Sequence, residues 1–372
     1  MWRELELGEV VTLQRGFDLT EDQRKPGNVP VVSSSGISGS HSVAKVKGPG
    51  VVTGRYGTLG KIYFIRDDFW PHNTTLFAKD FHGNDERYVY YLLNSLNLAT
   101  HSAVSAVPGV NRNDLHRIPV LLPPLRTQRR IAEILGRLDD KIEVNRRINR
   151  TLDAMAQALY KHWFVDFGPF QDGEFVESEM GLVPKGWRVG TLGEIAKNEK
   201  TLVDPQKLDP QTPYIGLADM PQGSIALDTW GIAGDSFSTK CQIERGQILF
   251  GKLRPYFKKV GVAPVDGVCS TDILVVVPQQ AEYFSMVLCL LTQQEFIDHT
   301  EAVSDGTRMP RVSWEMMAKY PMVLPDLVTA CQFDGIVRPW LESITRNVVE
   351  NRALATTRDY LLPRLLARDV EV

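Results

Sequence analysis

Cysteine and long apolar runs are both scarce in this sequence of 372 residues. The four cysteines are Cys241, Cys269, Cys289 and Cys331. Because no two of them have CxxC spacing, we expect reduced thiols in a core rather than a zinc site or a disulfide framework. The longest apolar runs, at 273–277 and 286–291, are too short to span a membrane. The N-terminus lacks the basic and then apolar pattern of a signal peptide, so we expect a cytoplasmic protein with no membrane partner.

Motifs that would identify an enzyme are missing as well. No GxGxxG opens a helix after a strand, and no NPPY-like or DPPY-like tetrapeptide of an amino-methyltransferase occurs. Residues 54–61 resemble a phosphate-binding loop, but five residues rather than four separate Gly54 from Gly60, and Ile62 replaces the Ser or Thr. The seven histidines have no metal-ligand spacing. The aspartate pairs at 67–68 and 139–140 are interpreted as solvated charges. A non-catalytic protein without a metal site is therefore favoured.

Charge is small in total but unevenly distributed. The chain has 42 Lys and Arg against 45 Asp and Glu, a net charge of −3. Residues 125–164 carry nine basic and five acidic side chains. Residues 240–259 carry six basic side chains and one acidic side chain. Residues 165–186, by contrast, carry one basic side chain and five acidic side chains. A chain that is acidic overall can therefore still present a local face for nucleic acid.

Residues 125–164 are predicted to form one long helix with an apolar seam. Ile131, Leu138, Leu152 and Leu159 share one heptad position, and Leu135, Ile142, Ala156 and Trp163 share the other. Asn145 and Asn149 interrupt the seam at its middle. A helix of 40 residues would be about 60 Å long at ~1.5 Å per residue, which exceeds what one small domain can cover. The helix therefore needs a second helix as its partner.

That second helix appears when the chain is compared with itself at an offset of 202 residues. The matched pairs are Pro123 with Pro325, Leu125 with Leu327, Ile142 with Ile344, Asn145 with Asn347, Asn149 with Asn351 and Leu152 with Leu354. Polar residues in such a seam fix the register of the helices at a cost in stability. The second helix is expected over 327–366, with a kink or short break at Pro339 and its end at Pro363.

The remaining segments are predicted to form two mixed α/β domains. In residues 1–124 we expect strands at 29–34, 50–54, 61–65, 74–79 and 118–122, and a helix at 87–99. In residues 187–326 we expect strands at 214–217, 247–252, 260–265, 272–277 and 320–324, and a helix at 283–299. Residues 165–186 are expected to be a linker. The fold class is therefore α+β, with two globular domains separated by two long coiled-coil helices in a pseudo-two-fold repeat. Antiparallel helices are favoured because the short linker leads directly into the second domain.

Each domain contains a basic, aromatic loop at the same place in this plan. Glycine lets a backbone approach phosphate, Arg can bind guanine edges and Lys supplies charge. The alternative is that these loops are only solvated hairpin ends. The candidate DNA-binding residues are Ser35, Lys45, Lys47, Arg55, Tyr56, Lys61 and Arg112, and Lys252, Arg254, Tyr256, Lys258, Lys259 and Arg311.

Several segments resemble one protein family. HWFVDFGPF at 162–170 and SEMGLVPKGWRVGTLGEIA at 178–196 resemble the central region of specificity (S) subunits of type I restriction-modification enzymes. PPLRTQRRIAEILGRLDDKIEVNR resembles the conserved helix of that family. GRYGTLGKIYF, WPHNTTLF and VPGVNRNDL resemble one class of its target-recognition domains. The resemblance covers essentially the whole chain. The sequence departs from the family pattern in two ways. The chain is short for the family, and Pro339 lies inside the second helix.

The resemblance implies a non-catalytic subunit that binds double-stranded DNA. In this family the domains, here 1–124 and 187–326, each recognise one half of a split DNA sequence, and the helices, here 125–164 and 327–366, set the spacer. Two modification subunits bind S-adenosylmethionine, and restriction subunits use ATP and Mg. This chain is therefore expected to bind no cofactor itself. Because the two loops differ, an asymmetric site is predicted. The candidate subunit-binding residues are Arg146, Arg147, Trp163, Phe164 and Phe167.

Three alternatives remain open from the sequence. The chain could be the recognition subunit of a related, type II-like system. It could be a self-contained DNA methyltransferase or nuclease, which would bind S-adenosylmethionine alone. It could also be a coiled-coil scaffold without a DNA role, in which case replacing Lys252 and Arg254 would leave DNA affinity unchanged.

Overall fold

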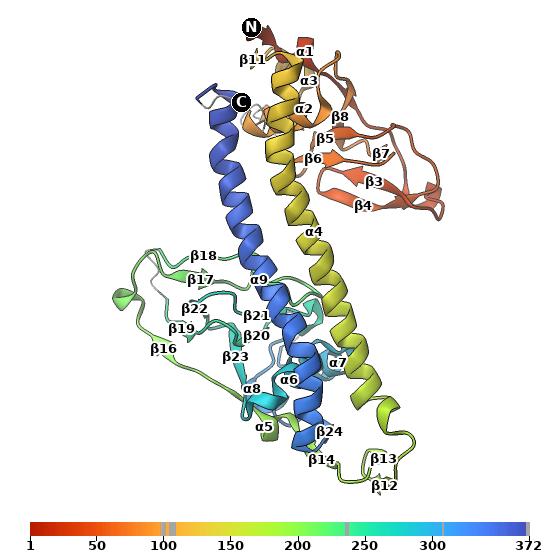
Figure 1. The fold of residues 1–372 in the computed structure, drawn as a ribbon, viewed down its shortest axis with the longest axis vertical. Coiled ribbons are helices and arrows are strands. Elements are labelled where there is room, and N and C mark those ends of the chain that lie inside the picture. Colours follow the sequence, from red (N-terminus) through yellow and green to blue (C-terminus); the bar gives the residue numbers. More distant parts are fainter. Residues whose placement is uncertain (97, 99–101, 104–108, 235–237, 307–308, 370–372) are drawn as a thin grey trace. The chain divides into compact units, whose positions relative to one another are not determined.

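A computed structural model describes the chain except residues 97, 99–101, 104–108, 235–237, 307–308 and 370–372. Contacts divide the chain into two compact units. Unit 1 comprises residues 1–140 and 354–372, and unit 2 comprises residues 141–353. Each unit contains one mixed α/β domain and a segment of both long helices (Figure 1). In the part of the chain that is described, no helix is long and apolar enough to cross a membrane.

The two long helices are continuous and antiparallel. Helix α4 runs from Leu125 to Phe164 and helix α9 from Leu327 to Leu366, each with 40 residues. In unit 1, Arg358 of α9 forms an ion pair with Asp139 of α4 at 2.7 Å. In unit 2, residues 145 and 149 of α4 bond residues 351 and 347 of α9, so the numbers rise in one helix as they fall in the other. The antiparallel coiled-coil arrangement predicted from the sequence is confirmed.

The four seam asparagines pair reciprocally within unit 2. The Nδ2 of Asn145 donates to the Oδ1 of Asn351 at 2.9 Å, and the Nδ2 of Asn347 donates to the Oδ1 of Asn149 at 2.8 Å. Asn145 also donates to the carboxylate of Glu350 at 2.7 Å. Asn145 is equivalent to Asn347 in the repeat, and Asn149 is equivalent to Asn351. A local two-fold axis between the helices therefore converts each of the two bonds into the other. The polar layer is therefore a register device shared by the two helices.

Two sequence-based expectations about α9, the short break at Pro339 and the end at Pro363, are wrong, whereas the alternative of a kink at Pro339 stays a prediction. The helix is not broken at Pro339, because the turns on both sides are held in the unit 2 core by Phe333, Val337 and Leu341, all buried. Proline removes only one backbone donor there. A Cβ built on Gly335, one turn before Pro339, would have no neighbour within 4 Å. The helix also continues past Pro363, whose carbonyl accepts from the Ala367 N–H at 2.8 Å.

The domain in unit 1 has two larger sheets, the two-stranded sheets β1-β11 and β10-β9, and short helices. A four-stranded sheet has the order β2-β8-β5-β6, and a three-stranded sheet the order β4-β3-β7. The strands are β1 (Arg3–Glu6), β2 (Thr12–Arg15), β3 (Val29–Ser33), β4 (Gly36–His41), β5 (Gly50–Gly54), β6 (Ile62–Ile65), β7 (Trp70–Pro71), β8 (Thr75–Asp80), β9 (Ser102–Ala103), β10 (Gly109–Val110) and β11 (Pro119–Leu122). The helices are α1 (Leu7–Val10), α2 (Glu86–Ser95), α3 (Arg112–His116) and the 3-10 turn η1 (Glu21–Gln23). The end of the helix predicted at 87–99 lies partly outside the described residues.

The domain in unit 2 follows the same plan with additions. Its two larger sheets have the orders β15-β23-β20-β21 and β16-β19-β22-β17-β18, and β14 pairs with β24 in a two-stranded sheet. The strands are β14 (Arg188–Thr191), β15 (Ala196–Asn198), β16 (Leu202–Val203), β17 (Pro213–Ile215), β18 (Gly231–Ile232), β19 (Lys240–Ile243), β20 (Ile248–Gly251), β21 (Val260–Val262), β22 (Gly267–Ser270), β23 (Ile273–Pro278) and β24 (Pro321–Leu324). The helices are α5 (Leu192–Ile195), α6 (Phe284–Thr292), α7 (Gln294–Ala302) and α8 (Trp314–Met317), with the 3-10 turns η4 (Pro205–Lys207), η5 (Pro255–Phe257) and η6 (Ala281–Tyr283).

The helix predicted at 283–299 is two helices rather than one. Gln293 has an extended backbone with φ −65° and ψ 145°, which ends α6 and begins α7. Its side-chain amide donates to the Oε1 of Gln157 in α4 at 2.6 Å. This bond to the long helix stabilises the break, which helical periodicity alone could not indicate.

The internal repeat is visible in the order of the strands. The sheet β2-β8-β5-β6 corresponds strand by strand to β15-β23-β20-β21, and the parallel pair β3–β7 corresponds to β17–β22. A two-residue turn joins β3 to β4, whereas residues 216–230 join β17 to β18. This longer segment contacts both long helices. The Ile225 N–H donates to Asp153 of α4 at 3.2 Å, and Arg352 of α9 donates to the Trp230 carbonyl at 2.8 Å.

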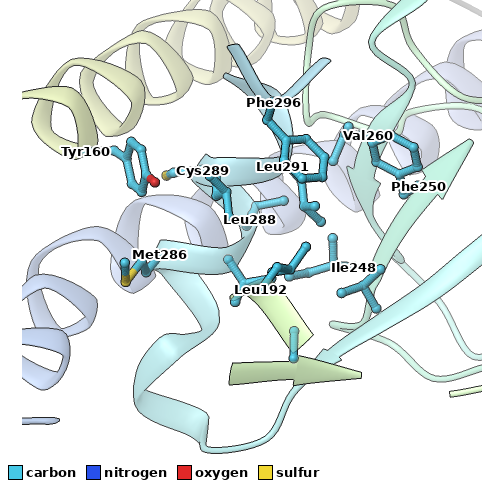
Figure 2. Close-up of a cluster of buried hydrophobic side chains, with 14 of the residues drawn as sticks. Tyr160, Leu192, Ile248, Phe250, Val260, Met286, Leu288, Cys289, Leu291 and Phe296 are labelled. Atoms are coloured by element: carbon cyan, nitrogen blue, oxygen red, sulfur yellow. The ribbon is translucent and has the colours of Figure 1, made fainter. Parts of the chain in front are cut away.

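Each domain shares its hydrophobic core with the long helices. In unit 2, one buried cluster contains Tyr160 of α4, Leu192 of α5, Phe250 of β20 and Leu288 of α6, and Cys289 lies next to Tyr160 in it (Figure 2). Phe333 of α9 belongs to the same cluster. In unit 1, buried residues of α4 and α9 join the domain core in the same way, namely Ile131, Leu135 and Leu365. A domain and its helix segments are therefore one packed body in each unit.

Asp139 and Asp140 are not solvated charges, so that interpretation is wrong. Asp140 accepts from Arg87 at 2.7 Å and also pairs with Arg66, while Asp139 accepts from the Tyr91 hydroxyl at 2.5 Å. The Arg87 guanidinium beside Asp140 holds the pKa of that carboxyl below its usual range. Both aspartates therefore attach the unit 1 domain to α4.

Two further segments differ from the sequence analysis. Residues 165–186, expected to be a linker, contain the 3-10 turn η3 (Gly168–Phe170) and a hairpin of β12 (Phe175–Ser178) and β13 (Gly181–Pro184). Three of the cysteines are buried free thiols, as predicted, but Cys331 is exposed on α9 and does not belong to a core.

The asparagine layer leads to a prediction about stability. Asn145→Leu leaves the buried Oδ1 of Asn351 without its donor, so the free energy of unfolding should fall by about 1–3 kcal/mol. Asn145→Leu with Asn351→Leu should recover that loss, because an apolar pair replaces a bonded polar pair. Urea unfolding of the full chain measures both. Val144→Leu, at an exposed neighbouring position, is the matched control. A double variant as unstable as the sum of the single variants would contradict this account.

Candidate nucleic-acid interface

Residues 54–61 form the turn of a β-hairpin, which determines what the glycines do there. The segment joins β5 to the antiparallel strand β6, so no helix follows it. A phosphate-binding loop of the nucleotide-binding type needs a helix at that point, so this structure excludes that interpretation. A Cβ on Gly54 would lie 1.9 Å from the Thr58 carbonyl oxygen. Only glycine allows the chain to close this tightly.

Four segments of unit 1 converge at this hairpin. The Arg55 N–H donates to the Thr74 carbonyl at 2.8 Å, and the Val110 N–H donates to the Arg55 carbonyl at 3.0 Å. The Ser34 N–H donates to the Thr74 hydroxyl at 3.3 Å. We call the resulting surface tip 1, formed by residues 33–36, 54–61, 72–75 and 109–112.

Tip 1 collects five of the seven candidates in the first domain. Arg55 stacks on Tyr56 with its Cζ 4.6 Å from the ring centroid, and Tyr56 is 39% exposed. Ser35 and Lys61 are exposed in the adjoining turns, and Arg112 is exposed at the start of α3. A cation over an exposed ring is suited to packing against nucleotides.

Lys45 and Lys47 do not join the others, so the loop predicted from sequence is not a single patch. Both precede β5, whereas Arg55 follows it, and a five-residue strand is about 17 Å long. Lys45 lies instead over Trp70, with its Nζ 5.2 Å from the ring centroid. Both lysines are exposed and form a separate basic site at the other end of the strand.

Unit 2 has a corresponding surface between β20 and β21. The turn η5 is flanked by Arg254 and Lys258, whose φ angles are 51° and 48°. Left-handed conformations cost non-glycine residues about 1–2 kcal/mol each and are concentrated at functional sites. Tyr256, between them, is 42% exposed. We call this surface tip 2, formed by residues 252–259 and 310–313.

Backbone and side-chain bonds hold tip 2 together. The Arg254 N–H donates to the Pro310 carbonyl at 2.8 Å, and Arg311 forms an ion pair with Asp272 at 2.7 Å. Burial lowers the pKa of Lys252, which is only half-exposed. The Nζ of Lys259 donates to the Leu217 carbonyl at 2.5 Å and is half-buried, so this lysine has a structural bond inside the domain.

The charge at the two tips is largely unneutralised. Within the described ranges, no carboxylate forms an ion pair with Arg55, Lys61, Arg112 or Arg254. Cations without a fixed counter-ion on the protein can neutralise phosphates and release their bound ions. The sequence analysis did not include Ser34 and Thr74, which position Arg55. The signal for Thr74 is the polar run at 72–74 between β7 and β8, and the signal for Ser34 is the pair of serines at 34–35 between β3 and β4.

The candidate subunit-binding residues fall into two groups. Arg146 and Arg147 are exposed on α4, where they pair with Asp228 at 3.8 Å and Glu143 at 3.2 Å. Trp163 and Phe167 are half-buried against the unit 2 core. Phe164 is 6% exposed, because it packs against Trp187 and Phe333. The prediction is therefore wrong for Phe164, which is a core residue.

A second apolar stripe on α4 was not predicted. Val144, Ile148 and Met155 are 49%, 40% and 44% exposed, and Thr151 and Ala158 are exposed between and beyond them. The steps of four and three residues place all five on one face of the helix. We call this face the outer stripe of α4. The sequence of α4 does contain this signal, as a second heptad series, but the stronger inner seam obscures it.

Comparisons with known proteins agree on one family. The family described as type I restriction modification DNA specificity domain matches residues 1–154 and 184–332. The specificity subunit of type I restriction enzyme MjaIX from Methanocaldococcus jannaschii is 25% identical over 304 residues, which cover 77% of this chain and 69% of that protein. The specificity subunit of type I restriction enzyme EcoDI from Escherichia coli is 24% identical over 413 residues. This alignment covers 99% of this chain and 85% of that protein.

A solved structure has the same fold. The S subunit of a type I restriction-modification system from M. genitalium superimposes with a TM-score of 0.60. The alignment covers 98% of this chain and 96% of that chain, at 18% sequence identity. The long helices and the two-domain repeat are therefore features of a known fold.

The left-handed residue at tip 2 gives a prediction that separates strain from charge. Arg254→Gly and Arg254→Ala remove the same cation, but only glycine adopts φ 51° without strain. The glycine variant should therefore be more stable than the alanine variant by about 1 kcal/mol, as measured by urea unfolding. The matched control is the pair Arg55→Gly and Arg55→Ala. Because the φ of Arg55 is not positive, the glycine variant should be the less stable of the two at this position. Equal stabilities of the two Arg254 variants would contradict the strain at this position.

Proposed function

We propose that each domain of this chain recognises one half of a bipartite DNA site. The proposal starts from the family, because the chain belongs to the type I restriction-modification DNA specificity proteins. The first reading domain comprises residues 1–124 and the second residues 187–326. The observation that carries the proposal is the pair of exposed tips at corresponding hairpins of one repeated plan. Each tip presents an Arg and a Tyr without a carboxylate partner, Arg55 with Tyr56 and Arg254 with Tyr256.

The two tips differ in residues, which favours an asymmetric site. Tip 1 is built on a glycine-rich turn, whereas tip 2 is built on a 3-10 turn between two strained basic residues. Arg side chains can bind the O6 and N7 of guanine with two hydrogen bonds, and Lys contacts phosphate without reading sequence. We assign base contacts to Arg55 and Arg254. Phosphate contacts are assigned to Lys61, Arg112, Lys258 and Arg311, with Lys45 and Lys47 on the flank of the first half-site.

The long helices set the number of unspecified base pairs in this proposal. A helix of 40 residues is about 60 Å long, and about 17 base pairs of DNA have the same length at ~3.4 Å per pair. The asparagine layer, Asn145 with Asn351 and Asn149 with Asn347, prevents one helix from sliding along the other. The spacer of the DNA site then depends on the protein rather than on the sequence between the half-sites.

The chain itself supplies no chemistry in this account. Two modification subunits would carry S-adenosylmethionine, and restriction subunits would carry ATP and Mg. We assign the outer stripe of α4 to a modification subunit, because an apolar stripe at heptad spacing fits the face of a partner helix. Arg146 and Arg147 lie beside the stripe, on exposed turns of α4, and would contact the polar edge of that partner.

Exchange of one domain is the experiment that tests the proposed function. Residues 1–124 are replaced by the corresponding domain of a relative, and the chain is expressed with its modification subunits. Mapping of methylated DNA should show a new sequence in one half of the motif, with the other half and the spacer unchanged. A motif in which both halves stay intact, or both change, would refute modular reading.

The outer stripe gives a separate prediction about assembly. Ile148→Asp places a charge in the apolar stripe and should weaken binding of the modification subunit at least tenfold, or about 1.4 kcal/mol. The stability of the isolated chain should not change, since Ile148 is 40% exposed. Ile232→Asp is the matched control, because Ile232 is 51% exposed in β18 and is not a residue of the stripe. Affinities from titration calorimetry that are the same for both variants would rule out the stripe as the docking face.

A further inference from the structure

Two cysteines of unit 2 face each other across neighbouring strands. Cys241 of β19 and Cys269 of β22 are directly opposite in an antiparallel ladder. Directly opposed residues have their Cα atoms about 4.5–5.5 Å apart and point to the same face of the sheet. A disulfide needs Cα atoms about 4.4–6.8 Å apart, so the backbone already satisfies that requirement. Both residues are free thiols in one buried cluster with Ile215 and Leu249.

The two thiols differ in their access to solvent. Cys241 lines a cavity of about 140 Å³ together with Lys200, Lys252, Ser313 and Glu315. Cys269 is fully buried and does not line this cavity. A small polar molecule that enters the cavity would therefore meet Cys241 first.

The electrostatic environment also distinguishes them. The neighbouring Cys269 thiol, together with the ammonium groups of Lys200 and Lys252, lowers the pKa of Cys241 to about 7. The neighbouring Cys241 sulfur and burial raise the pKa of Cys269. Because the thiolate is the nucleophile, Cys241 is the reactive member of the pair.

We propose that Cys241 and Cys269 form a peroxide-sensitive dithiol, in which Cys241 is oxidised first and Cys269 closes a cross-strand disulfide. The Cys241 sulfur attacks one oxygen of hydrogen peroxide, the O–O bond breaks, and a sulfenic acid and one water form. The Cys269 sulfur then attacks the Cys241 sulfur, the S–O bond breaks, and a second water leaves with the Cys269 proton. The two thiols lose two electrons in total, and the peroxide gains them.

The position of the pair connects it to tip 2. Strand β22 ends at Ser270, and Asp272 follows two residues later. The Asp272 carboxylate holds Arg311 at 2.7 Å, and its carbonyl accepts from the Lys252 N–H at 2.9 Å. Oxidation removes the Cys241 thiolate beside Lys252 and ties β19 to β22. On the basis of the proposed function, we expect the disulfide to weaken recognition of the second half-site.

Thiol counting in the full chain tests the modification itself. The Cys331→Ser background removes the exposed thiol and leaves three. After treatment with hydrogen peroxide, unfolding and alkylation, one free thiol should remain, and peptide mapping should join the peptides of Cys241 and Cys269. Cys289 should stay reduced, because it is fully buried and burial raises its pKa. If all three thiols survive conditions that fully oxidise glutathione in the same tube, the proposal is wrong.

Two variants test the order of the steps. In Cys269→Ser, oxidation of Cys241 should stop at a sulfenic acid that dimedone traps, whereas in Cys241→Ser, Cys269 should stay a thiol. Dimedone labelling of Cys269 in Cys241→Ser that equals the labelling of Cys241 in Cys269→Ser would overturn the assigned order. Peptide mapping of the chain with both cysteines needs neither variant, so a folding defect in one does not decide the result.

A second measurement separates this proposal from the proposed function. The oxidised chain, assembled with its modification subunits, is compared with the reduced chain for methylation of DNA carrying the mapped site. A loss of methylation that a dithiol reductant reverses, and that Cys241→Ser with Cys269→Ser abolishes, supports the connection to tip 2. A disulfide that forms without changing methylation refutes that connection. A reduced chain without sequence-specific methylation would instead refute the proposed function.

Discussion

The reciprocal asparagine bonds between α4 and α9 are the constraint on which this structure depends. Two long helices with apolar seams can slide by a heptad at little cost, unless a polar layer is satisfied in only one register. Asn145 is fully buried and its Oδ1 has no partner among the described residues, so the layer has a cost in stability. That cost is understandable if a defined register matters more than maximal stability.

Each domain depends on that register because its core includes both helices. In unit 1 the domain is attached to α4 by Asp139 and Asp140, and Arg358 of α9 bonds Asp139 as well. In unit 2 the segment 216–230, which has no equivalent of similar length in unit 1, contacts α4 at Asp153 and α9 at Arg352. The same fold is therefore fixed to its helices by different residues in the two units. The exposed tips can then vary in sequence without affecting the attachment.

The helices and the repeat could be predicted from the sequence because they depend on local periodicity and on self-comparison. The seam and the equivalence of Asn145 with Asn347 and of Asn149 with Asn351 followed from residue spacing, and the antiparallel direction followed from the short linker. The bonds that join Asn145 to Asn351 and Asn347 to Asn149 were not predicted. Features that depend on tertiary packing could not be predicted in this way. Proline tolerance at Pro339, the break at Gln293 and the burial of Phe164 each follow from contacts with distant segments. The separation of Lys45 from Arg55 likewise depends on which end of β5 each residue occupies.

The central claim is that the length of the helix pair determines the gap between the two recognised half-sites. The most direct measurement removes one heptad from α4 and the facing heptad from α9, followed by mapping of methylated DNA in cells that express the assembled complex. Seven residues correspond to about 10 Å, or about three base pairs, so the account predicts a gap shorter by about three base pairs with both half-sites unchanged. An assembled, active complex that keeps the original gap would contradict it.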